Sequence, residues 1–125
     1  MNLSFENPPF LTRHEMISRL ESNDPETIQR TLVSLVFHDR DFSYSWFTVM
    51  NYTRSSIASV RQVAYTCLGH IARLHQKIEP TSFEAAIIAG LSDENRFVQG
   101  SALNALEDAS IYVKTLPSKL KTFIR

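Results

Sequence analysis

The sequence has little cysteine, little glycine and no long apolar run. Its single cysteine, Cys67, excludes an intrachain disulfide and favours a reducing compartment. Its three glycines, Gly69, Gly90 and Gly100, are too widely spaced to form a glycine-rich phosphate-binding loop. The longest apolar run, residues 85–91, is far shorter than the roughly 20 residues that cross a bilayer. We therefore expect a soluble, cytoplasmic protein without a membrane segment.

The formal net charge is zero, because 13 Lys and Arg residues balance 13 Asp and Glu residues. This balance argues against wholesale binding of nucleic acid, since proteins that bind it are usually strongly basic. The first ten residues carry no basic side chain, unlike a secretory signal, so we expect a mature start. The chain has 125 residues and 43% hydrophobic content, enough for a single domain over residues 1–125 with one packed core.

A capping residue followed by matched apolar positions recurs three times. In each copy an apolar anchor lies five residues after the cap, and two more follow at intervals of four. The copies are Asn23 with Ile28, Leu32 and Val36; Ser55 with Val60, Ala64 and Leu68; and Asp93 with Val98, Ala102 and Leu106. This spacing places the anchors on one face of a helix. Offsets of 32 and 38 residues between copies are typical of helix-hairpin arrays.

The periodicity along the whole chain predicts an all-α fold of about six or seven helices. The expected helices span residues 12–21, 23–37, 42–54, 56–75, 80–91 and 93–112, with a short terminal helix after Pro117. Capping boxes are expected at Asn23 with Glu26 and at Thr81 with Glu84. No strand pattern competes, and Cys67 is expected in the core.

Two segments, residues 55–71 and 91–109, resemble the second helix of HEAT repeats. The matching elements are Asp93 after Leu91, the pair Val60 and Arg61, Ala64 or Ala102, and the ending with Leu68, Gly69 and Ile71. Gln99 stands where the family usually has arginine, and Ser55 where it usually has aspartate. The resemblance implies a short HEAT-like α-hairpin solenoid. By size and architecture the chain also resembles small immunity proteins of bacterial contact-dependent toxin systems, which implies a non-catalytic, cytoplasmic protein that binds a cognate toxin.

Charge is segregated along the chain. Residues 79–108 carry six acidic residues and one basic residue, whereas residues 42–78 carry four basic residues and no acidic one. The acidic block could cover the basic active site of a nuclease toxin, in place of the phosphates that this site binds. The alternative interpretation is an ordinary solvated surface.

The basic block gives a second functional hypothesis, a nucleic-acid-binding protein acting through Arg54, Arg61 and Arg73 between aromatic residues. Four cations are few, however, beside the roughly six to ten phosphate contacts of a strong binder. Nucleic acid is therefore not the expected partner. A scaffold or adaptor role is the third hypothesis.

The aromatic residues between positions 42 and 52 cannot all face inward. Tyr44 and Tyr52 are the candidates for exposed anchors, and core packing is the alternative. The expected partner-binding residues are Tyr44, Tyr52, Arg61, Tyr65, Glu94, Asn104, Glu107 and Asp108.

Catalytic and metal sites are not expected. His70 and His75 are five residues apart, so they leave the shared helix face that a metal-binding pair needs. We therefore expect no enzyme activity, no cofactor and no metal. The sequence predicts a protein that is monomeric when free and binds its partner by occlusion.

Overall fold

The computed structural model describes residues 8–124, so the expectation about the chain start lies largely outside the described residues. Within these residues the chain forms six α-helices and one 3-10 helix, and no β-strand. The elements are α1 (Arg13–Leu20), α2 (Pro25–His38), α3 (Phe42–Tyr52), α4 (Ala58–His75), α5 (Pro80–Leu91), α6 (Arg96–Tyr112) and η1 (Ser118–Phe123). The prediction of an all-α fold with about six or seven helices is confirmed, and the expected terminal helix is of the 3-10 type.

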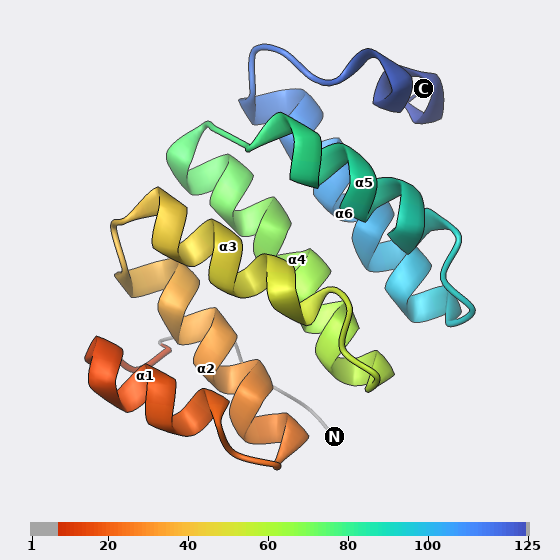
Figure 1. Ribbon diagram of the computed structural model, residues 1–125. Coiled ribbons are helices and arrows are strands. Elements are labelled where there is room, and N and C mark those ends of the chain that lie inside the picture. Colours follow the sequence, from red (N-terminus) through yellow and green to blue (C-terminus); the bar gives the residue numbers. More distant parts are fainter. Residues whose placement is uncertain (1–7, 125) are drawn as a thin grey trace.

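Three helices form the inner layer of the fold. In this layer α2, α4 and α6 lie side by side, with the most extensive packing between α4 and α6. Figure 1 shows α3 and α5 on one side of this layer, where α3 packs on α4 and α5 packs on α6. At the two ends, α1 packs on α2 and η1 packs on α5.

The helices of the inner layer run parallel. Near the start of α2 and α4, Gln29 Nε2 donates to Ser59 Oγ at 3.0 Å. Near their ends, the ring centroids of Phe37 and His70 are 5.1 Å apart. Since these pairs occur in the same order along both helices, α2 and α4 point the same way.

Glycine allows close approach between helices at two places. A Cβ atom at Gly69 in α4 would lie 3.2 Å from the Cα atom of Ala105 in α6. A Cβ atom at Gly90 in α5 would lie 2.6 Å from Ala102 Cβ and 2.7 Å from Tyr65 Cζ. These contacts bring the backbones of α4, α5 and α6 together around the Tyr65 ring.

The core contains the repeated apolar anchors that the sequence predicts. All of the anchors of the three repeated patterns are buried, and so are the large side chains of Trp46 and Phe83. Cys67 is fully buried, which confirms its expected place in the core, and burial raises the pKa of its thiol to about 12. The thiol is therefore protonated and a poor nucleophile at neutral pH.

Acidic side chains begin α2 and α5, so the capping boxes expected there are wrong. Asp24 caps α2 in place of Asn23, because its Oδ2 accepts a hydrogen bond from the backbone N–H of Thr27 at 3.1 Å. Glu79 caps α5 by accepting from two backbone N–H groups of the first turn, and Thr81 lies inside the helix. In both helices the residue just before the N-terminal proline supplies the cap.

Ser55 and Asp93 do not cap their helices either. The backbone carbonyl of Ser55 accepts from Arg61, and α4 begins after Ile57 without a side-chain cap. The Asp93 carboxylate accepts from Arg61 and from the backbone N–H of Asn95, and Asn95 caps α6. Both expected caps are therefore engaged in the loops that connect the outer and inner helices.

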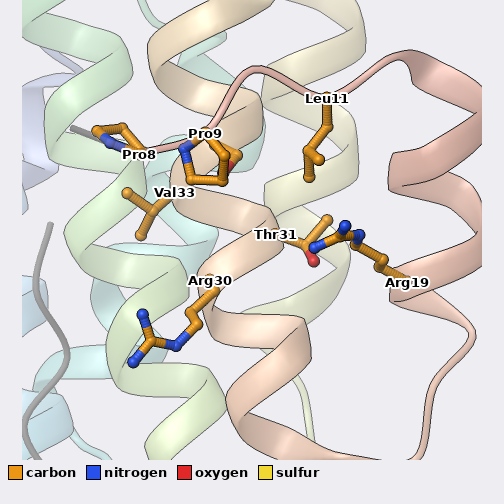
Figure 2. A pocket seen from close by; sticks show the side chains of 8 residues that line it. Pro8, Pro9, Leu11, Arg19, Arg30, Thr31 and Val33 are labelled. Carbon is orange, nitrogen blue, oxygen red and sulfur yellow. The ribbon is translucent and has the colours of Figure 1, made fainter.

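The segment before α1 crosses α2. Pro8 and Pro9 lie across this helix beside Val33, next to a cavity of about 110 Å³ (Figure 2). His38 Nε2 lies 2.7 Å from the carbonyl oxygen of Pro8, a hydrogen bond that holds the segment at the end of α2. The guanidinium groups of the two arginines that line this cavity point in different directions in Figure 2 and do not form a common site.

Several carboxyl groups make the fold sensitive to acid. Hydrogen bonds from Arg13 lower the pKa of Asp39, and hydrogen bonds from Arg61 lower that of Asp93. Hydrogen bonds to Ser82 likewise lower the pKa of Glu79. A carboxyl group with a lower pKa in the folded state binds fewer protons than in the unfolded chain. Its contribution to stability is therefore complete above the unfolded pKa of about 4 and is lost as the pH falls through the folded pKa.

We predict that the free energy of unfolding falls between about pH 5 and pH 2, and urea unfolding at pH 7 and pH 3 measures this change. The Asp93→Asn variant lacks one of the titrating groups, so its stability should change less between the two values than that of the wild type. Equal wild-type stability at pH 7 and pH 3 would contradict this account.

Candidate partner-binding surface

Tyr65 does not lie on the surface, which does not support its expected role in partner binding. Its side chain is only 2% exposed, and its hydroxyl donates to the backbone carbonyl of Ala86 at 2.7 Å. Burial raises the pKa of this phenol to about 12. The ring joins α4 to α5, and its function is structural.

Arg61 is also engaged inside the molecule. Its Nε and Nη2 atoms donate to the two carboxylate oxygens of Asp93 at 2.9 and 3.0 Å, and its Nη1 donates to the carbonyl of Ser55 at 2.9 Å. Both ionic side chains are only 13% exposed. This bidentate pair joins the loop before α4 to the loop before α6, so Arg61 is a poor candidate for a contact with a partner.

Tyr44 and Tyr52 are partly buried, which does not support their expected role as exposed anchors. The guanidinium of Arg13 stacks over the Tyr44 ring, 4.1 Å from its centroid. Tyr52 packs against the core, and burial raises the pKa of its phenol. The exposed aromatic side chain of α3 is Phe47, which is 51% exposed.

The remaining four expected residues lie on α6 or just before it. Glu94, Asn104 and Glu107 are exposed, and Asp108 is half-buried. A Cβ atom at Gly69 would lie 2.6 Å from Asp108 Oδ2, which places this carboxylate over α4. Three of these four residues, Asn104, Glu107 and Asp108, therefore lie on α6, whereas Glu94 lies in the loop before it.

Large apolar side chains share this helix with the acidic residues. Phe97 and Ile111 are 60% and 71% exposed, and Leu103 is 39% exposed. Phe97, Asn104 and Ile111 are seven residues apart along α6, so they lie on one face. The spacing with the polar Asn104 is the sequence signal that could predict the exposure of Phe97 and Ile111. Their apolar character alone would instead predict a place in the core.

Two partly buried residues of α4, His70 and Arg73, lie beside α6. Burial is the main cause that lowers the pKa of His70. The charge of Arg73 in α4 lowers this pKa further, whereas the charge of Asp108 in α6 raises it. Arg73 Nη2 lies 3.2 Å from His70 Nδ1, so the guanidinium donates to the neutral imidazole. We call the set His70, Arg73, Phe97, Asn104, Glu107, Asp108 and Ile111 the α4–α6 surface.

The α4–α6 surface has the composition of a protein interface. Exposed apolar side chains such as Phe97 and Ile111 lie beside charged ones such as Glu107 and Arg73. Interfaces concentrate binding energy in a few such apolar and arginine residues, while charged neighbours guide association and fix the register. The surface can therefore bind a macromolecule of complementary shape and charge.

Metal binding and membrane insertion find no support in the described residues. No group of three or more His, Cys, Asp or Glu side chains within residues 8–124 is placed to hold a metal ion. None of the helices in this part of the chain combines the length and the apolar character needed to cross a membrane. No family model, no curated protein and no solved structure matches the chain.

Proposed function

We propose that the chain is a short HEAT-like solenoid that binds a protein partner through the α4–α6 surface. The observation that carries this proposal is the exposed face of α6, where Phe97 and Ile111 flank Asn104 and Glu107. Apolar side chains of this size cost solvation energy when exposed, so their exposure at both ends of one helix face favours a partner. The proposed activity is binding without catalysis.

Contacts from one repeat position to the next copy support the solenoid part of the proposal. Gln29 and Arg61 both follow the first anchor of their copies, and they contact Ser59 and Asp93 in the next copy. The two partners differ in position, because Asp93 begins its copy and Ser59 lies four residues after Ser55. At the same position in α6, Gln99 donates to the backbone carbonyl of Asp93 in its own preceding loop. Side chains that reach from one copy to the next are what stacked repeats require.

In its sharpest form, the proposal is that this is an immunity protein that neutralises a cognate bacterial toxin in the cytoplasm. Glu107 and Asp108 give the α4–α6 surface an acidic character that suits a basic partner, such as the active site of a nuclease, and Glu94 is a further exposed carboxylate before the same helix. Occlusion of that site would block its access to phosphates. The free protein is proposed to be monomeric.

One of the three arginines expected to bind nucleic acid is engaged inside the molecule. Arg61 is held by Asp93, which leaves Arg54 and Arg73 from the basic set named for that role. Filter binding to RNA and DNA tests this alternative. Binding tighter than micromolar at physiological salt would favour it over the toxin proposal.

The toxin proposal is tested by co-expression. In an immunity system the immunity gene directly follows the toxin gene. The chain is therefore expressed together with the carboxyl-terminal domain of the protein that the gene directly upstream encodes. We expect the wild type to restore growth. Glu107→Lys reverses a charge of the α4–α6 surface and should weaken the purified complex by about tenfold, mainly through slower association at low salt. Binding kinetics at two salt concentrations measure this change.

Glu21→Lys is the matched control, because Glu21 is an exposed acidic residue at the other end of the array, after α1. It should change the affinity less than twofold. An upstream domain that the chain fails to neutralise would contradict the immunity proposal. Equal effects of the two charge reversals would contradict the use of the α4–α6 surface.

A further inference from the structure

A groove with a volume of about 320 Å³ lies between α3 and α5, among the outer helices. Met50 lines it from α3, Ala85 and Ala89 line it from α5, and the buried Tyr65 lies beneath. This volume falls within the range of small-molecule sites, roughly 300–1,000 Å³. The α4–α6 surface does not share any of its lining residues with this groove.

The groove is preformed because hydrogen bonds and close packing fix the positions of its two walls. At one end, Trp46 Nε1 in α3 donates to Ser82 Oγ in α5 at 2.9 Å. Beneath the groove, the Tyr65 hydroxyl is held by the Ala86 carbonyl, and the Tyr65 ring is wedged against Gly90. The short side chains of α5 leave the space between these contacts unfilled. A ligand would enter without reorganisation of the helices, which favours binding.

One positive charge remains available at the rim. Asp93 and Arg54 both line the groove, but the Asp93 carboxylate is neutralised by Arg61 at 2.9 Å. Arg54 is exposed and forms no ion pair or side-chain hydrogen bond with the described residues. The groove therefore combines apolar walls with an exposed arginine among its lining residues.

We propose that this groove binds a small amphiphilic organic anion, with its carboxylate or sulfonate on Arg54 and its apolar body between α3 and α5. The guanidinium prefers planar anions that accept two hydrogen bonds, which is why a carboxylate suits this rim better than a neutral alcohol. The apolar body contacts Met50 and Ala89. This inference is independent of partner binding at the α4–α6 surface.

Octanoate is the probe, and the only tryptophan of the chain reports its binding. Trp46 is fully buried and hydrogen-bonded to a residue that lines the groove, so occupation should change its emission. Titration of the full chain should give a saturable change with a Kd on the order of a millimolar or tighter, since small ligands gain only a fraction of a kcal/mol per heavy atom. Calorimetry should give one site per chain. The neutral analogue 1-octanol should bind at least about tenfold more weakly.

Two variants test the charge of Arg54 and the volume of the groove separately. Arg54→Glu should weaken octanoate binding at least about tenfold, whereas Lys119→Glu, an equal charge reversal on η1, should leave it unchanged. Ala89→Leu keeps the charge of Arg54 but fills part of the groove. This variant should show no saturable binding of octanoate, and circular dichroism should confirm that it is folded. Linear, unsaturable titration of the wild type, or equal affinity of the wild type and Arg54→Glu, would overturn the proposal. Octanoate binding that survives Ala89→Leu would place the site elsewhere and overturn it as well.

Discussion

Gly90→Ala is expected to destabilise the protein by about 2–3 kcal/mol, although alanine is the better helix former. The new Cβ atom would lie 2.6 Å from Ala102 Cβ and 2.7 Å from Tyr65 Cζ, and neither neighbour can move easily. Ala102 is fully buried, and the Tyr65 hydroxyl is held by the Ala86 carbonyl. Relief of the clash therefore requires α5 to move away from α4 and α6.

Gly100→Ala is the matched control for this substitution. Gly100 also lies within a helix, but a Cβ atom there would meet nothing within 4 Å. We expect this variant to be more stable by about 0.5–1 kcal/mol, because alanine loses less backbone entropy than glycine. Urea unfolding followed by circular dichroism gives both values. A Gly90→Ala variant as stable as Gly100→Ala would show that α5 does not pack closely on Tyr65.

Arg61→Ala is expected to cost about 2–3 kcal/mol of stability. The variant loses three hydrogen bonds and leaves the carboxylate of Asp93, which is 13% exposed, without its cation. The effect should exceed that of an ordinary surface substitution because the pair is bidentate and largely removed from water. Arg40→Ala, at an exposed position, should change the stability by less than about 0.5 kcal/mol.

A double-mutant cycle separates the ion pair from other effects of the substitution. We expect Asp93→Ala to be destabilising as well, and the double variant to be less destabilised than the sum of the two single variants. The difference should be at least about 1 kcal/mol. Additive effects would contradict a direct role of the pair in joining the loops before α4 and α6.

The helices could be predicted from the sequence because apolar spacing determines which face is buried. The anchors of the three copies, such as Leu32, Ala64 and Leu106, are all buried. The exact starts could not be predicted where neighbouring residues compete for the cap. Asp24 lies beside Asn23, and either side chain can accept from the first turn.

A contact between loops explains the shifted start of α6. Asp93 is engaged by Arg61, a contact across 32 positions that no local pattern contains. A capping box does form at the start of α1, between Thr12 and Glu15, and its Thr-x-x-Glu pattern is present in the sequence.

The candidate surface was harder to predict than the helices. The pattern of α4 alone does not reveal that Tyr65 is covered, because its neighbour Gly90 belongs to α5. Conversely, Phe97 and Ile111 are apolar and yet exposed. Their exposure depends on the position of α6 at the edge of the inner layer, a property of the array as a whole.

The most direct test of the central claim is a map of the bound surface. Nuclear magnetic resonance cross-saturation from the unlabelled upstream-encoded domain to the labelled chain identifies the residues at the interface. We expect the largest losses of signal at Phe97, Asn104, Glu107 and Ile111, with smaller ones at Arg73. Losses confined to α3 and α5, with α6 unaffected, would contradict the account.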